Sequence, residues 1–510
     1  MRVLKISGLS VVILLGVVFL ALQLPSVQNF VGQQVVKQLE KTLATEITVD
    51  DVRFGFFEAS LDNATFYDQQ QDTLLHAGRL YLQYNIWQLI YNDLTLNQLH
   101  LENGQVNLER PVGQTDFNYQ FIIDAFASDD TTSSGGSPFS VTPGIIELRN
   151  VRFAYNDWAG GSIFQQQLGR LHIHFNQLDL ENRQLALKEV LMDQPYTFLR
   201  TLPNTLPETP EPDTPAPVAS NDTMRWNPDD WDITLDHLRI TRGIFDQRNT
   251  LADTSQQPGK VNWNNLRVTK IDLDLFDLAL QADSIFGNLK HVSLAEQSGF
   301  QLDSLHTQLK VAPDQIFLAD LLIETPQSHI TDSIVFNYKS LADFNDFVNK
   351  VRFGGHFTES KIQIGDLAYF IPDLPLANEA YYLNGTVSGT VSSLRGKDLQ
   401  LKYGQNTDLL GNFSIYGLPD PDETFIDFTL DYLTTNKREF EELLPFVQLP
   451  ANVAKMGNIR FSGNFTGFLQ DFVAYGELQT AVGYFESDIN LSIDAATKIP
   501  QYKGNLSARN

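Results

Sequence analysis

The chain has 510 residues and a formal net charge of −26, with 62 acidic and 36 basic side chains. So large an excess of negative charge repels phosphate backbones, which makes nucleic acid an unsuitable partner. The sequence has no cysteine, which excludes disulfides, thiolate metal sites and cysteine nucleophiles. It is rich in Phe and Tyr, with 35 and 17 copies, as is typical of strands.

The chain opens with an uncharged apolar run over residues 6–24, preceded by Arg2 and Lys5. About 20 apolar residues can cross a hydrocarbon core of roughly 30 Å as a helix. Cationic flanks tend to stay in the cytoplasm, so we predict a single-pass anchor within residues 1–25 and the rest of the chain beyond the membrane. The apolar anchor residues are Ile6, Leu9, Val11, Val12, Ile13, Leu14, Leu15, Val17, Val18, Phe19, Leu20, Leu22 and Leu24.

A cleaved signal peptide is the competing interpretation of this run. Signal peptides have an apolar core of about 7–15 residues and a cleavage site of small residues. Here the run is longer, and Ala21 is the only small residue near its end. We therefore favour an uncleaved anchor, both over a signal peptide and over a buried core helix.

The next segment, residues 26–45, predicts an amphipathic helix. Val27, Phe30, Val31, Val35 and Leu39 fall on one helical face. The helix would either cover the first strands of the domain or lie at the membrane surface.

From residue 46 onwards the apolar residues repeat with a period of two, which predicts β segments over 46–127, 143–201 and 225–510. A flexible loop over 128–142 and a Pro-rich disordered loop over 202–224 separate them, because neither stretch can bury enough apolar surface to order itself. We interpret both as loops that leave one sheet. Short helices are expected only near residues 86–90, 366–370 and 440–444, so a doubly wound α/β fold is excluded.

One apolar pattern returns along the chain. It reads Leu94-x-Leu96-x-x-Leu99-x-Leu101-x-x-Gly104, recurs from Ile233 to Gly243, and has shorter copies from Ile146 and Ile47. A three-residue step reverses the side-chain parity of a strand, and a bulge or a bend absorbs this reversal. The copies therefore predict a repetitive β architecture with the apolar pairs on one side.

Residues 270–280 give the most regular alternation. Ile271, Leu273 and Leu275 alternate with Asp272 and Asp274, and the pattern then slips by one residue before Phe276. Later strands are punctuated by glycines, which suit curved strands. The pattern runs to the last residue, so we expect the sequence to be truncated within a longer repeat.

Three parts of the sequence resemble the AsmA/TamB family. They are the anchor with LQLPSVQNFVGQQVVKQLEKTLATEITVDDVRF and the Leu94 repeat, then Ser298–Ile330, and then Leu383–Asp420, which resembles the TamB-like proteins of Bacteroidetes-type bacteria. The resemblance implies a mostly β fold: an inner-membrane helix and an elongated, repetitive periplasmic β-sheet folded into an apolar, β-taco-like groove. It also implies phospholipid transport between inner and outer membranes or, as an alternative, a scaffold that assists outer-membrane protein insertion with an Omp85-type barrel partner.

A sheet that alternates apolar and acidic residues has one dry face and one wet face. Closed on itself, the dry face is an ordinary core; left open, it forms a trough that acyl chains can occupy. Both possibilities stay open at this point. The candidate lining residues are Leu94, Leu96, Leu99, Leu101, Ile233, Leu235, Leu238, Ile240, Ile271, Leu273 and Leu275.

Residue patterns that carry chemistry are scarce. His172 and His174 are two apart on a predicted strand and offer half a metal site, but the sequence shows no third ligand. Asp272, Asp274 and Asp277 fit a solvated strand face better than a pair of catalytic carboxylates. Asp129 and Asp130 lack the spacing of a calcium loop, and no nucleotide-binding or hydrolase motif occurs. We therefore predict no catalytic residue, cofactor or metal, with an enzyme of unrecognised site as the third hypothesis.

Overall fold

The computed structural model describes residues 25–55, 57–85, 93–126, 140–206, 225–370, 379–418, 420, 423–443, 449, 451–468, 470–493 and 500–509. These residues form 25 strands and a few short helices, so the prediction of a mostly β chain is confirmed. The predicted anchor, residues 6–24, lies outside them. Within the described ranges, no helix combines the length and hydrophobicity that a membrane span requires.

The chain divides into two compact units. Unit 1 comprises residues 1–218, 231–255 and 262–274, and unit 2 comprises residues 219–230, 256–261 and 275–510. The main boundary falls inside strand β11 (Asn265–Gln281), and neither of the two predicted loops coincides with it.

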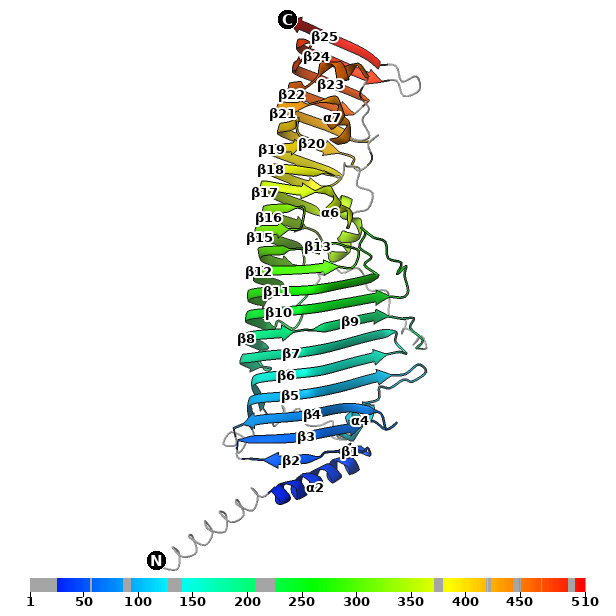
Figure 1. The fold of residues 1–510 in the computed structure, drawn as a ribbon, viewed down its shortest axis with the longest axis vertical. Coiled ribbons are helices and arrows are strands. Elements are labelled where there is room, and N and C mark those ends of the chain that lie inside the picture. Colours follow the sequence, from blue (N-terminus) through cyan, green and yellow to red (C-terminus); the bar gives the residue numbers. More distant parts are fainter. Residues whose placement is uncertain are drawn as a thin grey trace, which may run out of the picture. The chain divides into compact units, whose positions relative to one another are not determined.

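Unit 1 begins with helix α2, which is followed by short strands that pair with β3 and then by longer strands that succeed one another along the unit (Figure 1). The elements are α2 (Pro25–Leu43), β1 (Ile47–Thr48), β2 (Asp51–Phe54), β3 (Glu58–Tyr67), β4 (Thr73–Tyr84), β5 (Asp93–Arg110), α4 (Gln120–Phe126), β6 (Ser140–Asp157), β7 (Ser162–Asp179), β8 (Gln184–Asp193), β9 (Tyr196–Thr201) and β10 (Asp232–Asn249).

Two pairings in unit 1 are parallel. β5 pairs with β6 in parallel, and β10 pairs in parallel with both β8 and β9. Parallel neighbours need a long connection that returns the chain to the starting end of the strand. Residues 111–139 and 202–231 are these connections, so the two polar stretches that the sequence marks as loops belong to crossovers. The first loop is shorter than predicted, because β6 already begins at Ser140.

A line of residues in the left-handed conformation crosses the strands of unit 1 near their middle. Asn63, Asn103 and Asn150 have φ angles of 49°, 52° and 50°. Asn tolerates this left-handed region better than most residues do. The side chains of Asn103 and Asn150 also join across the line, with Nδ2 of Asn150 donating to Oδ1 of Asn103 at 2.6 Å. The residue that follows each of these asparagines is buried, as Ala64 and Val151 show.

The predicted absorption of the three-residue step by a bulge is confirmed in β5. Gln98 pairs with Gln83 while Leu96 pairs with Tyr84, so Asn97 is the extra residue. Leu96 and Leu99 therefore lie on the same side of the sheet. In the Ile146 copy the step contains Asn150, which has a left-handed backbone, and in the Ile47 copy it contains the break between β1 and β2.

The slip in β11 lies slightly later than the sequence predicts. Asp277 has a φ of 53°, in the left-handed region, and lies at the slip. A side chain placed at Gly287 would touch both Leu275 and Leu278, at 3.0 and 3.7 Å, so these two leucines share a side. Leu278, two positions beyond Phe276, therefore continues the apolar series.

Unit 2 is an antiparallel meander from β14 to β25 (Figure 1). Its elements are β12 (Ser284–Glu296), β13 (Gln301–Leu302), β14 (Ser304–Ala312), β15 (Gln315–Glu324), β16 (His329–Asn337), η1 (Leu341–Asp346), α5 (Phe347–Lys350), β17 (Arg352–Gln363), α6 (Ile364–Ala368), β18 (Ala380–Thr390), β19 (Ser393–Tyr403), β20 (Thr407–Tyr416), β21 (Phe425–Thr435), α7 (Lys437–Leu443), η2 (Ala451–Met456), β22 (Ile459–Phe468), β23 (Asp471–Thr480), β24 (Gly483–Ile493) and β25 (Pro500–Arg509).

Two of the three expected short helices correspond to α6 and α7, and the third, near residues 86–90, lies outside the described residues. Both helices pack over strand ends. Ile364 of α6 meets Tyr381 and Tyr403, and Leu443 of α7 packs against the same cluster. The core of unit 2 at this position therefore lies between short helices and strand ends.

Candidate functional site

Two rows of aliphatic side chains cross the strands of unit 1 side by side. Within each row, every residue is the direct pairing partner of the next, and the two rows are two residues apart along each strand, so they share a face. We call them together the aliphatic face of unit 1. The first row is Ala59, Leu82, Leu99, Ile146, Ile173, Val190 and Leu238, and the second is Leu61, Leu80, Leu101, Leu148, Leu171, Met192 and Ile240.

The structure brings several predicted lining residues together on this face. Leu99, Leu101, Leu238 and Ile240 are members of the two rows. Ile271 joins Ile240, because a side chain placed at Gly243 would lie 3.2 Å from both.

The remaining predicted lining residues extend these rows or lie elsewhere. Leu96 pairs with Pro143, and Ile233 and Leu235 pair with Leu185 and Leu187. Leu235 and Leu275 are buried, whereas Ile233, Leu273 and Leu96 are half-buried. The side chain of Leu94 lies outside the described residues.

The aliphatic face is only partly covered by protein. Among the side chains of its two rows, Leu171 and Val190 are buried, at 9% and 7% exposure, and all the others are half-buried. A closed sheet core would bury most of them fully. The face is therefore an apolar surface that is partly accessible to solvent and could be contacted by an apolar molecule.

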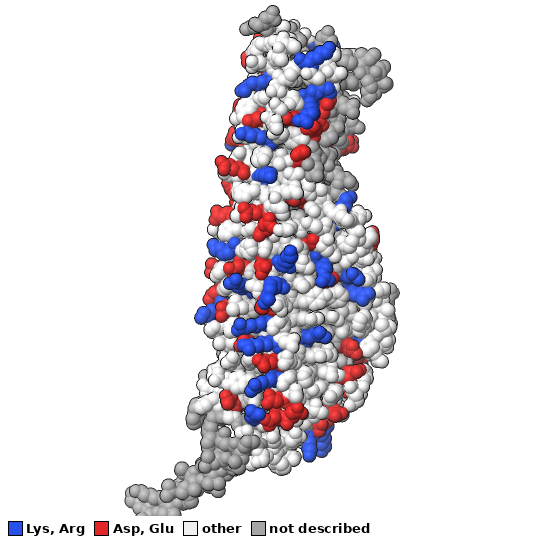
Figure 2. Space-filling model, viewed as in Figure 1, with Lys and Arg blue, Asp and Glu red and all other residues white. Residues whose placement is uncertain are grey.

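The opposite face of the same strands is charged. Arg149 and Arg170 both contact Glu147 at 2.9 Å. Burial raises the pKa of Glu147, but the two guanidinium groups outweigh it and hold that pKa below its usual value. Acidic and basic side chains are likewise interspersed over the face drawn in Figure 2. The strands thus separate an apolar side from a charged one.

Unit 2 carries a longer pair of such rows, which we call the apolar face of unit 2. It spans the strands from β12 to β24, and at about 4.8 Å per strand its length is about 50 Å. One row is Gly287, Leu309, Leu318, Ile334, Gly355, Val387, Gly396, Phe413, Phe428, Phe465, Ala474 and Ile489, and the other is Ile285, Val311, Ile316, Phe336, Phe353, Gly389, Leu394, Ile415, Ile426, Gly467, Phe472 and Leu491.

Aromatic rings fill the places where glycine leaves the apolar face without a side chain. The ring of Phe413 lies over Gly396, and a Cβ at Gly355 would meet the ring of Phe357. Phe413, Phe428 and Phe465 then follow one another, with ring centroids 6.0 and 6.4 Å apart. The face therefore stays apolar from strand to strand, and none of its members carries a polar side chain.

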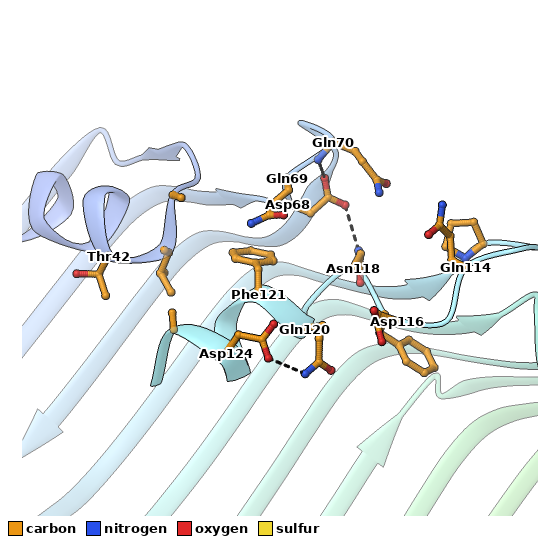
Figure 3. Close-up of a pocket in the computed structure, with 15 residues that line it drawn as sticks. Thr42, Asp68, Gln69, Gln70, Gln114, Asp116, Asn118, Gln120, Phe121 and Asp124 are labelled. Atoms are coloured by element: carbon orange, nitrogen blue, oxygen red, sulfur yellow. Dashed lines mark hydrogen bonds between the residues drawn. The ribbon is translucent and has the colours of Figure 1, made fainter. Parts of the chain in front are cut away.

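A cavity of about 430 Å³ lies at the α2 end of unit 1 (Figure 3). Asp68 accepts hydrogen bonds from the backbone N–H of Gln70 at 2.9 Å and from Nδ2 of Asn118 at 3.2 Å. Gln120 donates to Asp124 at 3.0 Å. These bonds tie the first crossover to the β3–β4 turn, so we interpret the cavity as a structural junction.

The predicted histidine pair gains a third neighbour in the structure. His172 and His174 lie on β7, and Glu189 of β8 pairs with His174. One ligand atom of each residue lies within 4.8 Å of the others. The sequence could not reveal Glu189, because its place depends on the register between two strands.

The other acidic candidates do not form a carboxylate cluster. Asp274 contacts His237 at 2.6 Å, and Asp272 accepts a hydrogen bond from the backbone N–H of Arg242 at 3.2 Å. Asp277 is exposed and has a left-handed backbone conformation within β11. Asp129 and Asp130 lie outside the described residues.

Comparisons of the chain with protein-family models, with curated proteins and with solved structures find no match. The class that the fold defines is a mostly β chain of two strand ladders, each with an apolar face.

Proposed function

We propose that this chain is an AsmA/TamB-like, membrane-anchored periplasmic protein that conducts phospholipids between the inner and outer membranes. The supporting observation is the apolar face of unit 2, whose rows cross twelve strands without a polar side chain. The aliphatic face of unit 1 has the same character.

The energetics of acyl chains suit such a surface. Each methylene taken from water gains about 0.8 kcal/mol, so a phospholipid tail binds wherever the strip is apolar. Because the apolar face of unit 2 has nearly even polarity, an acyl chain binds with similar free energy at each strand. It therefore moves along the face without meeting a site that binds it much more tightly than the others. The head group stays in water, and the charged face of the strands repels the tail. No bond is made or broken, so the proposal requires no catalytic residue.

A scaffold for outer-membrane protein insertion is the alternative. Such a scaffold would template substrate strands on free sheet edges and hand them to an Omp85-type barrel partner. Each strand from β14 to β24 is paired on both sides. The edges in this region are occupied by neighbours, which favours the lipid conduit over the scaffold.

Ile415 and Ser414 of β20 offer a matched test. They are adjacent and both half-buried, but only Ile415 belongs to the apolar face. A photoreactive benzoylphenylalanine at either position of the full-length chain is irradiated in intact cells, and the adducts are identified by mass spectrometry. We expect phospholipid adducts at 415 and none at 414. Protein adducts without lipid at 415 would favour the scaffold, and equal lipid labelling at both positions would contradict a lipid path on this face.

A further inference from the structure

We propose that His172, His174 and Glu189 form a binding site for a divalent transition metal on the polar side of unit 1. The inference does not depend on lipid transport, because the three residues lie outside the aliphatic face. It rests on the geometry of strands β7 and β8 and on the ion pairs that the surrounding charged groups make with other residues.

The three side chains converge on one point. His172 and His174 are two residues apart on β7 and so project from the same side of the sheet. Glu189 reaches them from β8, with its Oε1 atom 3.4 Å from Nε2 of His172. All three ligand atoms lie within 4.8 Å of one another. A tetrahedral Zn²⁺ with bonds of about 2.1 Å holds its ligand atoms about 3.4 Å apart, so small side-chain rotations complete the set.

The imidazole of His172 would give up few hydrogen bonds if it rotated toward a metal ion. Its Nδ1 atom is buried and has no hydrogen-bond partner among the residues that the structure describes. Its Nε2 atom contacts Glu189, which would become a ligand of the same ion. The ring therefore turns without breaking a bond to a third group.

The ionisable groups around the cluster are held by other partners. Arg149 and Arg170 both contact Glu147, which pairs directly with His172. His237, the partner of Glu189 on β10, contacts Asp274 at 2.6 Å. His100, which pairs with Glu147 from β5, lies 3.0 Å from Glu102. The guanidinium of Arg170 repels a cation, but Glu147 offsets much of its charge.

The donor set selects the class of metal. Two imidazole nitrogens and one carboxylate suit Zn²⁺, Co²⁺, Ni²⁺ or Cu²⁺, whereas Ca²⁺ and Mg²⁺ prefer sets of oxygen ligands. The cluster is half-buried, so the remaining coordination position stays open to water or to a ligand from another molecule. The ion would clamp β7 to β8 where their register shifts, next to His174 and Phe175.

The test uses the full-length chain, purified in mild detergent and stripped of metal with a chelator. It is titrated with Co²⁺, followed by visible absorption, and with Zn²⁺ in competition with a chromophoric chelator. We expect one high-affinity equivalent. His174→Ala and Glu189→Gln should each weaken Zn²⁺ binding at least tenfold. His329→Ala is the matched control, because His329 also contacts a glutamate, Glu324, at 3.3 Å but belongs to no such triad among the residues that the structure describes.

Thermal unfolding of the same proteins gives a second readout. Zn²⁺ should raise the Tm of the parent chain and of His329→Ala, and should leave that of His174→Ala unchanged, because an ion that binds only the folded state stabilises it. The proposal is overturned if the parent chain binds neither ion, or if His174→Ala and Glu189→Gln bind Zn²⁺ as tightly as the control does.

Discussion

The carboxylate of Glu439 accepts two hydrogen bonds from Asn406, one from its backbone N–H at 2.9 Å and one from its side-chain amide at 2.8 Å. The backbone N–H of Gln405 and the hydroxyl of Thr407 donate to the same carboxylate, at 3.1 and 2.9 Å. Glu439 lies on α7 and is 1% exposed. It therefore fastens this helix to the turn between β19 and β20.

Removing this carboxylate should destabilise unit 2. In Glu439→Ala the donors of residues 405–407 lose their common acceptor, and buried unsatisfied donors are costly, so we expect a loss of about 3 kcal/mol in the free energy of unfolding. Urea denaturation measures it. Glu442→Ala on the same helix is the control, with a smaller expected change of about 1 kcal/mol. Glu442 is half-buried and makes only long contacts, at 3.7 Å with Arg438 and at 3.5 Å with the hydroxyl of Tyr403, which donates to it. Equal losses in both variants would contradict the role of Glu439.

The same carboxylate should make stability depend on acid. Burial raises the pKa of Glu439, but the hydrogen bonds from Asn406, Gln405 and Thr407 outweigh it and lower the pKa to about 2. A folded-state pKa below the unfolded one gives stability that is fully present above the ordinary value of 4.5 and is lost as the pH falls toward 2. The loss should reach up to about 3 kcal/mol. Urea midpoints between pH 5 and pH 2 should fall less steeply in Glu439→Gln, and an identical slope would disprove this linkage.

The line of left-handed residues in unit 1 should be sensitive to β-branched residues. Asn103→Gly and Asn103→Val both lose the bond to Asn150, but only valine opposes the φ of 52°. We expect Asn103→Val to be less stable than Asn103→Gly by about 1–2 kcal/mol. Urea unfolding of the two variants gives the difference directly. Gln105→Val, two positions on in the same strand, is the control and should change stability little, since valine suits an ordinary strand position.

A charge on the apolar face should remove bound lipid. We expect phospholipid to co-purify with the full-length chain in mild detergent and to be lost in Ile415→Asp, because a carboxylate on the strip disfavours an acyl chain. Ser414→Asp places the same charge on the opposite face of β20 and should keep the lipid. Native mass spectrometry reports both.

A milder variant separates lost binding from lost folding in this experiment. Ile415→Thr keeps a β-branched side chain, so the strand should form while the strip is interrupted by one hydroxyl. Circular dichroism checks the fold of each variant. If folded Ile415→Asp and Ile415→Thr carry as much phospholipid as Ser414→Asp does, the apolar face is not where the lipid lies.

The recurring three-residue step shows how much of the strand structure the local pattern of apolar residues predicts. From Leu96 and Leu99 alone the sequence predicts a bulge or a bend, because side-chain parity along one strand is a local property, and β5 has a bulge at Asn97. In residues 270–280 the same reasoning finds the slip but misplaces it, since several apolar residues in succession fit either position. The place of the slip, at the left-handed residue Asp277, is set by the contacts of Leu275 and Leu278 around Gly287 on the next strand.

The sequence by itself determined the strand-rich class, the repeated three-residue step and the exclusion of thiol chemistry, because period, parity and composition are properties of the chain itself and of neighbouring residues. Only the tertiary structure decided which residues meet. The parallel pairing of β5 with β6 sets Leu99 beside Ile146, and the register of β8 on β7 sets Glu189 beside His174. The turn at residues 405–407 likewise donates hydrogen bonds to Glu439, which is more than thirty residues away in the sequence. Such contacts depend on strand order and register, and no local pattern encodes either one.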